Sequence, residues 1–84
     1  MPNATNEKRM LANIRAEIAR AGHSQSSFAR QIHMSQPAFS RRMLGRTPFT
    51  VGELTTVAES LGVTVARLMG ERADASAEPA AVAS

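Results

Sequence analysis

A broken apolar seam is the feature that most constrains how this chain can fold. Residues 24–45 read SQSSFARQIHMSQPAFSRRMLG, and the apolar side chains among them follow one helix face at Phe28, Ile32, Phe39 and Met43. Ser35-Gln36-Pro37 interrupts this seam, because serine favours a helix cap and proline is tolerated in the first turn of a helix but not in its interior. The segment therefore predicts two short helices joined by a turn at His33-Met34.

A longer helix is predicted before this segment, from about Thr5 to Ala21. Apolar residues recur there at steps of three and four, at Leu11, Ile14, Ile18 and Ala21. Either Thr5 or Asn6 is expected to cap the helix, and Gly22 is expected to stop it. Residues 1–4 are predicted to form a flexible N-terminus.

The two short helices have their own boundary signals. Ser24 is expected to cap the first of them, which ends near Ile32 and buries the apolar residues Phe28, Ala29 and Ile32. Either Ser35 or Gln36 caps the other, because proline disfavours helical geometry in the residue before it. Gly45 ends this helix, which turns Phe39 and Met43 inward.

Two further helices follow, and no strand-like alternation occurs anywhere. Thr50 caps a helix that ends at Gly62 and has an inner side of Val51, Leu54, Val57, Ala58 and Leu61. Thr64 caps a short fifth helix that carries Val65, Leu68 and Met69. The predicted fold class is therefore all-α, with one domain at 5–69. Residues 70–84 are small and polar with one proline, which is typical of a disordered tail or a linker.

Arginine is segregated from acid along the chain. Between Glu17 and Glu53 there is no acidic residue, but there are five arginines, namely Arg20, Arg30, Arg41, Arg42 and Arg46. All seven acids lie outside that window, although the net charge is only +3. Such placement is expected where one face of a protein meets a polyanion, and the alternative is an accident of composition.

Several classes of function are disfavoured by what the sequence lacks. It has no cysteine, and its two histidines are ten residues apart with no acid near them, so no nucleophile–base pair and no metal site can be written down. An enzyme is not expected, and neither is a cofactor or a small-molecule ligand. No apolar run approaches the roughly 20 residues that span a bilayer, and the N-terminus has no signal-peptide pattern, which favours a cytoplasmic protein without a membrane partner.

Two short helices joined by a tight turn are typical of a helix-turn-helix, whose second helix enters the major groove of DNA. If Phe39 and Met43 face inward, the outward residues of that helix are Gln36, Pro37, Ser40 and Arg41. Gln36 can pair with adenine and Arg41 with guanine, and either the Pro37 ring or the Ala38 methyl group can touch a thymine methyl group. The plainer alternatives are a solvated surface for Gln36 and Arg41, a helix contact for Ser40, and helix initiation for Pro37.

Other residues are candidates for contacts to phosphate. The free N–H groups of Ser24 and Gln25 at the start of a helix form a natural phosphate site. The positions after the second short helix should flank the groove, and these are Arg42, Arg46 and Thr47. Arg30 is a further candidate whose direction the sequence leaves open. For each of them the alternative is ordinary solvated surface.

Matching pairs and triplets of residues carry a family resemblance, namely Ser24-Gln25, Phe28-Ala29, Met34-Ser35, Phe39-Ser40-Arg41 and Leu61-Gly62-Val63. In gap-free register they resemble the lambda-repressor-like, or XRE-like, helix-turn-helix regulators, especially the small Cro/repressor-type proteins of high-GC bacteria and their phages. The resemblance covers residues 10–69. It implies a compact five-helix domain whose helices 2 and 3 form the helix-turn-helix, with base contacts at the outward positions given above. It also implies that the Gln25 backbone binds phosphate and that its side chain braces Gln36.

Two positions depart from the pattern of that family. His33 stands where the family usually has a turn glycine, so a left-handed turn with some strain is expected there. Met43 stands where many members have a glutamate, and we interpret it as a core residue that leaves Arg42 outside.

Together these features predict a sequence-specific DNA-binding transcriptional regulator, with repression as its expected mode of action. It would bind a two-fold operator in double-stranded DNA as a homodimer, formed in solution or only on DNA, with residues 36–44 of each protomer in the major groove. An activator is equally compatible with the sequence. The alternative from another class is an antitoxin-like or adaptor module that engages a partner protein through the tail from Gly70 onward.

Overall fold

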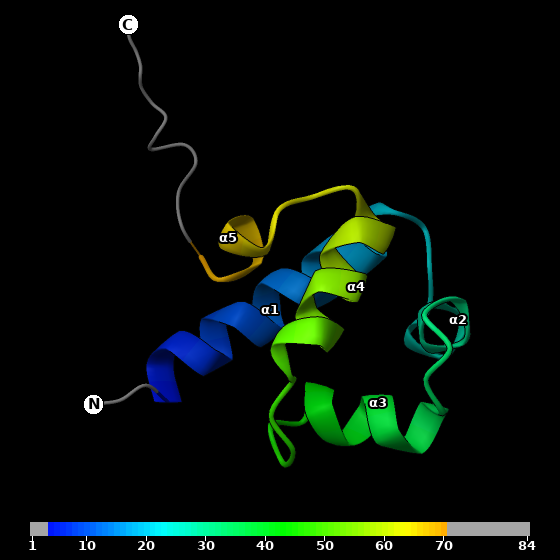
Figure 1. Ribbon diagram of the computed structural model, residues 1–84, viewed down its shortest axis with the longest axis horizontal. Coiled ribbons are helices and arrows are strands. Elements are labelled where there is room, and N and C mark those ends of the chain that lie inside the picture. The colour runs from blue at the N-terminus through cyan, green and yellow to red at the C-terminus, as the bar shows by residue number, and fades with distance from the viewer. Residues whose placement is uncertain (1–3, 71–84) are drawn as a thin grey trace, which may run out of the picture.

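Five helices and the turns between them make up the part of the chain that the computed structural model describes, residues 4–70. In chain order they are α1 (Ala4–Arg20), α2 (Gln25–Gln31), α3 (Gln36–Met43), α4 (Val51–Leu61) and α5 (Val65–Leu68). No strand occurs in this range, and the all-α prediction is confirmed. In Figure 1, α1 and α4 run through the middle of the molecule, α3 forms one end, and α5 lies toward the opposite end.

Local cap chemistry explains where four of the helices begin. A hydroxyl side chain before each of α2 to α5 accepts a hydrogen bond from the backbone N–H three residues later, and these caps are Ser24, Ser35, Thr50 and Thr64. Of the two candidate caps for α3, Ser35 takes the role, and Gln36 is the first helical residue. The expected cap of α1 is wrong, because that helix begins at Ala4 and both Thr5 and Asn6 lie inside it.

One core of aliphatic and phenylalanine side chains holds the helices together. The largest side chains that are fully enclosed are Phe28, Phe39, Ile14, Leu68 and Val57. The prediction that the two arms of the broken seam turn inward is confirmed, because Phe28, Ala29, Ile32, Phe39 and Met43 are all buried. The ring of Phe49, in the loop after α3, lies 6.1 Å from that of Phe39 and extends the core toward the loop.

Two positions predicted to face inward do not. Ala21 is exposed, and Val51 is 80% exposed. Ala21 follows the last residue of α1, and Val51 is the first residue of α4. Both residues fit the apolar period of their helix, but a side chain at a helix end is covered only if another element lies over it.

The short α5 is fastened to α1 by polar contacts. Asn13 Nδ2 donates a hydrogen bond of 3.1 Å to the carbonyl oxygen of Leu68. Glu17 Oε2 lies 2.8 Å from Arg20 Nη1 and 3.5 Å from Arg67 Nε, so one carboxylate joins the two helices. These contacts close the bundle at the end away from α3 (Figure 1). The tail predicted at 70–84 lies outside the described residues, apart from Gly70, and the domain boundaries stay predictions.

Candidate nucleic-acid interface

The arrangement of α2 and α3 is that of a helix-turn-helix. In Figure 1 the viewer looks along α2, whereas α3 runs across the picture below it. The turn between them contains His33 at φ 60°, which is the only non-glycine residue with positive φ in the described range. The expected left-handed turn at His33 is therefore confirmed. The N–H of His33 donates to the carbonyl oxygen of Arg30 at 3.1 Å, and the N–H of Met34 donates to that of Ala29 at 2.9 Å. These bonds give hydrogen-bond donors to carbonyl groups at the C-terminal end of α2.

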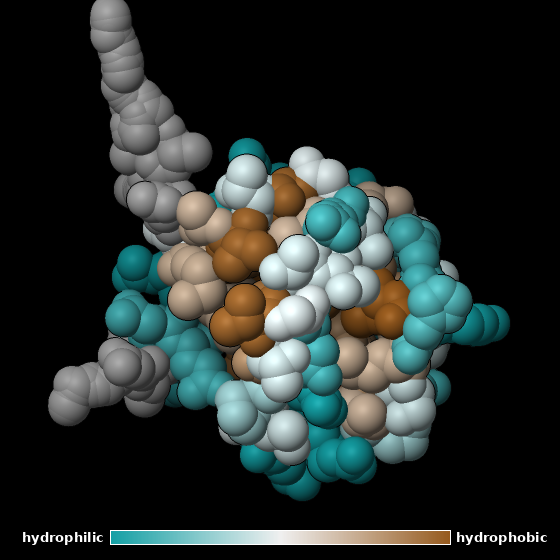
Figure 2. Space-filling model, viewed as in Figure 1, coloured by the Kyte–Doolittle hydropathy of each residue, from teal (hydrophilic) through white to brown (hydrophobic). Residues whose placement is uncertain are grey.

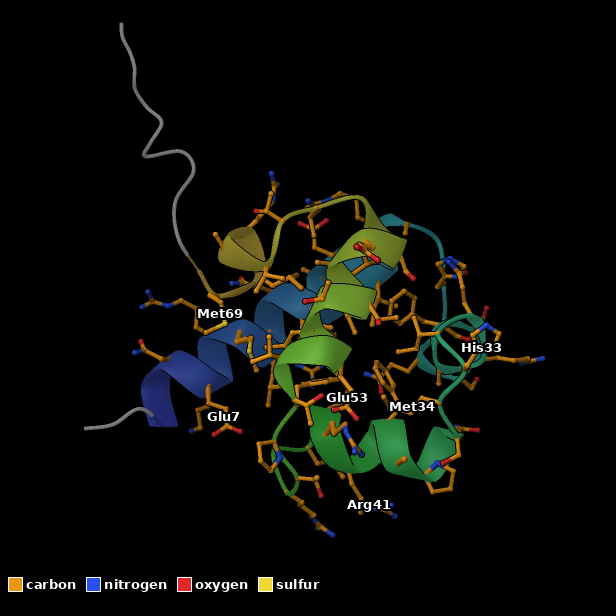
Figure 3. All side chains as sticks on the ribbon, in the orientation of Figure 1. Glu7, His33, Met34, Arg41, Glu53 and Met69 are labelled. Atoms are coloured by element: carbon orange, nitrogen blue, oxygen red, sulfur yellow. The ribbon has the colours of Figure 1, made fainter. Side chains whose placement is uncertain are left out.

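α3 has one buried side and one exposed side. Phe39 and Met43 are buried in the core, whereas Gln36, Pro37 and Arg41 are exposed. Ser40 is half-buried at the border between the two sides. Figure 3 shows the Arg41 side chain extending away from the other helices. The predicted outward face is thus formed as expected, and the base contacts assigned to it stay predictions.

Local sequence fixes where this helix begins. Ser35 Oγ accepts a hydrogen bond of 3.2 Å from the N–H of Ala38, and Pro37 is accommodated in the first turn, where its missing N–H costs nothing. Because the cap is Ser35, the side chain of Gln36 stands at the very start of the helix. That is where a recognition helix reaches base edges.

The surface around α3 is mostly hydrophilic and carries positive charge, with Leu44 as an exposed apolar residue at the end of the helix. In Figure 2 the apolar surface gathers over α5 and the neighbouring helices, and teal side chains cover the end of the molecule below α3. Two arginines of the acid-free window form ion pairs with the acidic residues at its two limits. Arg20 pairs with Glu17, and Arg42 pairs with Glu53. The other three arginines are exposed and make no ion pair within residues 4–70, and these are Arg30, Arg41 and Arg46.

Arg42 departs from its prediction. It was expected to lie outside, but only 17% of its side chain is exposed. Its Nε donates to Glu53 Oε1 at 2.9 Å, and its Nη1 donates to the carbonyl oxygen of Ala38 at 3.0 Å. The expectation that Arg42 points into solvent is therefore wrong, because a carboxylate eleven residues later draws the guanidinium back toward α4.

The remaining candidates for phosphate contacts are the exposed Arg30 in the last turn of α2 and four residues at the two ends of the helix-turn-helix. Ser24 is exposed and its Oγ accepts a 3.0 Å bond from the N–H of Ser27, whereas Gln25 is partly exposed at the start of α2. Arg46 is exposed in the loop after α3, and Thr47 beside it is half-buried. The phosphate contacts assigned to these residues stay predictions, and so does the bracing of Gln36 by Gln25.

Sequence reasoning missed Glu53 as part of this region. Glu53 Oε1 accepts hydrogen bonds of 2.9 Å from both Arg42 Nε and the backbone N–H of Thr50. The Arg42 hydrogen bond first, and the Thr50 bond second, hold the pKa of Glu53 below its ordinary range. The spacing of Thr50 and Glu53 is the signature of a capping box, and that signal could have identified Glu53 at the start of α4.

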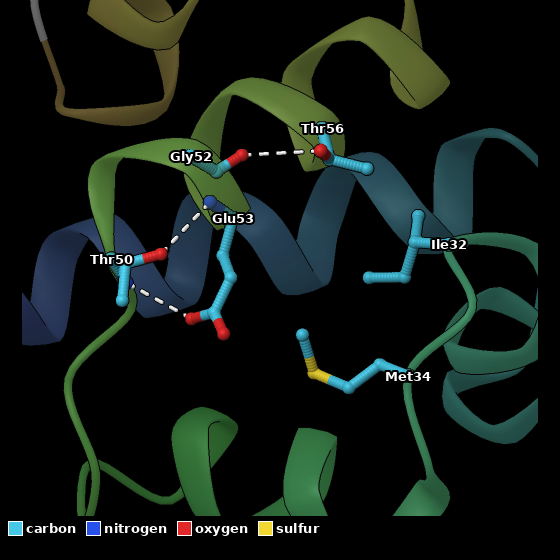
Figure 4. Close-up of a pocket in the computed structure, with 6 residues that line it drawn as sticks. All are labelled: Ile32, Met34, Thr50, Gly52, Glu53 and Thr56. Atoms are coloured by element: carbon cyan, nitrogen blue, oxygen red, sulfur yellow. Dashed lines mark hydrogen bonds between the residues drawn. The ribbon is translucent and has the colours of Figure 1, made fainter.

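A cavity of about 290 Å³ lies between the turn and the start of α4 (Figure 4). Its lining residues are Ile32, Met34, Thr50, Gly52, Glu53 and Thr56. Within the described part of the chain, no group of three or more histidine or acidic side chains is placed to hold a metal ion. No helix in that part is both long and apolar enough to cross a membrane.

Comparison with known protein families gives a match. The family model described as the BetR domain matches residues 6–84. No curated protein and no solved structure matches the chain significantly. The matched span contains α2, α3 and every candidate contact residue described above.

Proposed function

The chain belongs to the BetR domain family, whose members are small helix-turn-helix DNA-binding domains with a regulatory role, and from this premise we propose that it is a sequence-specific transcriptional regulator. In this proposal α3 lies in the major groove of double-stranded DNA. Gln36 and Arg41 pair with base edges, the Pro37 ring touches a thymine methyl group, and Ser40 is a further base contact. The protein acts as a lambda-repressor-like repressor in the cytoplasm, by covering a promoter.

The observation that carries the proposal is the division of α3 into two sides. Phe39 and Met43 anchor the helix in the core, and Gln36 and Arg41 stand exposed on its other side, with an exposed Arg46 beyond its end. An eight-residue helix with polar, hydrogen-bonding side chains at its start fits the roughly 12 Å width of the major groove. The exposed arginines around it supply phosphate contacts that hold the helix in register.

We propose that two protomers bind a two-fold operator. One short helix reads few base pairs, and half-sites about one helical turn apart would be read by two copies. Of the residues of α5 that could meet a partner, Leu68 is fully buried, whereas Met69 beside the helix is 50% exposed. Sedimentation velocity on duplexes with one or two half-sites tests this. Two protomers on the longer duplex support the dimer, and a single protomer on both contradicts it.

The experiment that tests sequence-specific reading begins with a selection. The protein selects its preferred duplex from a library of random DNA, and fluorescence anisotropy then compares that duplex with a scrambled one. We expect Gln36→Ala and Arg41→Ala each to cost about 1 to 3 kcal/mol on the preferred duplex and much less on the scrambled one.

Matched controls exist for both substitutions. Gln31 is an exposed glutamine at the end of α2, and Arg67 is an exposed arginine on α5, far from α3 in Figure 1. Gln31→Ala and Arg67→Ala should leave the preference for the selected duplex unchanged. If the selection enriches no sequence, and affinity for all duplexes collapses alike with salt, the protein binds DNA only through its charge. The proposal of a sequence-specific regulator then fails.

The antitoxin-like or adaptor alternative depends on the tail from Gly70 onward, which lies almost wholly outside the described residues. No contact within residues 4–70 favours it.

A further inference from the structure

α3 is held on two sides in different ways. Against α2 it packs through apolar side chains, with the rings of Phe28 and Phe39 5.9 Å apart. Toward α4 it is held by a polar link, the ion pair of Arg42 and Glu53. Within residues 4–70 this is the only ion pair that joins α3 to another helix, because the other two involve α1 and α5.

The guanidinium of Arg42 is fixed at two points. Its Nη1 donates to the carbonyl oxygen of Ala38 in the first turn of α3, and its Nε donates to Glu53 Oε1 in the first turn of α4. The Arg42 and Glu53 side chains are 17% and 25% exposed. These two bonds use two of the five guanidinium N–H groups and hold the side chain between α3 and the start of α4. It lies beside Arg41, the residue proposed to read guanine.

The carboxylate of Glu53 also takes part in the capping box of α4. Its Oε1 also accepts the N–H of Thr50 at 2.9 Å, while the N–H of Glu53 donates to Thr50 Oγ1 at 3.0 Å. One side chain therefore closes the capping box of α4 and holds Arg42. Figure 4 shows Glu53 reaching from α4 toward Thr50, and Figure 3 shows it above α3. The start of α4 and the orientation of α3 are coupled through this carboxylate.

We propose that Glu53 and Arg42 are positioning residues for DNA recognition, which together hold α3 at the angle where Gln36 and Arg41 meet base edges. Arg42 acts through Glu53 and makes no contact with phosphate. Base reading tolerates displacements of only about half an ångström, so a loosened α3 loses discrimination before it loses general affinity. This inference rests on the proposed function, because it assigns a role in the same reading step.

A phosphate-binding role for Arg42 predicts the opposite change in DNA affinity when the Glu53 charge is removed. If Arg42 binds phosphate, removing the Glu53 charge frees the guanidinium and raises affinity for every DNA. If the pair positions α3, the same change lowers affinity for the preferred duplex only. Glu53→Gln separates the two, because glutamine can still close the capping box but cannot form the ion pair.

Glu59→Gln is the matched control. Glu59 is an exposed glutamate on the same helix, and it makes no ion pair within the described range. Both variants remove one negative charge, so both share any general electrostatic gain in DNA binding. The difference between them reports the loss of the link to Arg42.

The test compares both variants with the wild type on the selected duplex and on a scrambled duplex. We expect Glu53→Gln to lower affinity for the selected duplex by about fivefold or more, and to leave affinity for the scrambled duplex unchanged or raised. Arg42→Met should reproduce that loss, and Arg42→Lys, which keeps the charge beside Glu53, should recover part of it. Glu59→Gln should preserve the ratio between the two duplexes.

Two outcomes overturn the inference. One is that Glu53→Gln raises affinity for both duplexes as Glu59→Gln does. The other is that Arg42→Met weakens both duplexes alike and lowers the salt slope by about 0.9, which is the signature of a lost phosphate contact.

A measurement without DNA separates this inference from the proposed function. Amide hydrogen exchange at residues 40–44 should be faster in Glu53→Gln and Arg42→Met than in the wild type and Glu59→Gln. Unchanged exchange overturns the positioning role even if the protein reads its DNA specifically. Faster exchange in a protein that selects no sequence means that the pair holds α3 but that the proposed function has failed.

Discussion

The rings of Phe28 and Phe39 lie 5.9 Å apart at an interplanar angle of 56°, one on each helix of the helix-turn-helix. Both side chains are almost completely buried. Tilted aromatic pairs at this separation contribute about 0.5 to 1.5 kcal/mol beyond the burial of their area. The angle between α2 and α3 is therefore set by an apolar contact as well as by the turn between them.

Phe28→Leu should lower the free energy of unfolding by about 1 to 3 kcal/mol, because the leucine keeps an apolar side chain but loses the ring pair and some volume. Urea denaturation followed by circular dichroism measures the change. Leu44→Ala is the control, since Leu44 is 62% exposed and should change stability by less than about 0.5 kcal/mol. Equal effects of the two substitutions would contradict the packing described for Phe28.

The turn residue His33 allows a test of backbone strain. Its φ of 60° lies in the left-handed region, and its side chain is exposed. His33→Gly should raise the unfolding free energy by about 0.5 to 1 kcal/mol, because glycine adopts this conformation without steric cost. His33→Val should lower it, since a β-branched side chain tolerates positive φ poorly. Thermal denaturation of both variants measures these changes in unfolding free energy. A loss of stability in His33→Gly would argue against a strained turn.

The lowered pKa of Glu53 makes stability depend on pH. Hydrogen bonds from Arg42 and Thr50 hold the pKa of Glu53 lower in the folded protein than in the unfolded chain. The contribution is present above the unfolded pKa, about 4.3, and is lost as pH falls through the lower folded value. The stability gap between wild type and Glu53→Gln should therefore shrink as pH falls below about 5. Urea denaturation across that range measures it, with Arg42→Met as the control in which the dependence is weaker.

Arg46 should contribute affinity without sequence preference. It is exposed in the loop after α3 and makes no ion pair within residues 4–70. Arg46→Ala should weaken binding to selected and scrambled duplexes alike and reduce the slope of log affinity against log salt by about 0.9. Anisotropy titrations at several salt concentrations measure both effects. Arg67→Ala at the other end of the molecule is the control, and a loss confined to the selected duplex would instead make Arg46 a base contact.

The hydrogen bond from Asn13 to Leu68 should hold α5 in place. Asn13→Ala leaves the carbonyl oxygen of Leu68 without this donor and should lower the unfolding free energy by about 1 kcal/mol. Asn6→Ala is the control, because Asn6 is exposed in the same helix and its side chain has no hydrogen bond among the described residues. Chemical denaturation compares the two, and hydrogen exchange should place the loosening at α5.

The starts of α2, α4 and α5 were predicted correctly because they depend on neighbouring residues, whereas the cap of α1 was not. A cap needs a hydroxyl group and an N–H three positions later, which is why Ser24, Thr50 and Thr64 could be identified from the sequence. At α3 the sequence left two candidates, because the preference of the residue before proline opposed the preference of serine for a cap. The structure favours Ser35.

The wrong predictions concern residues whose exposure or direction depends on tertiary contacts. Whether Val51 is covered depends on the elements around the start of α4, and the direction of Arg42 depends on Glu53, eleven residues away. Helical periodicity predicts neither the coverage of Val51 nor the direction of Arg42. The outward side of α3 could be predicted because Phe39 and Met43 fix the inward side, whereas base contacts by Gln36 and Arg41 stay predictions.

Along α3, the side chains that anchor the helix and those that face outward are different residues. Replacing Gln36 or Arg41 disturbs no buried contact, because both are exposed and the core is filled by Phe39 and Met43. Under the proposed function, relatives of this protein can therefore change their operators through single substitutions on this side, without first gaining extra stability. Arg42 has less freedom, since replacing it breaks its link to α4. Divergence within such a lineage should be rapid at positions 36 and 41 and slow at position 42.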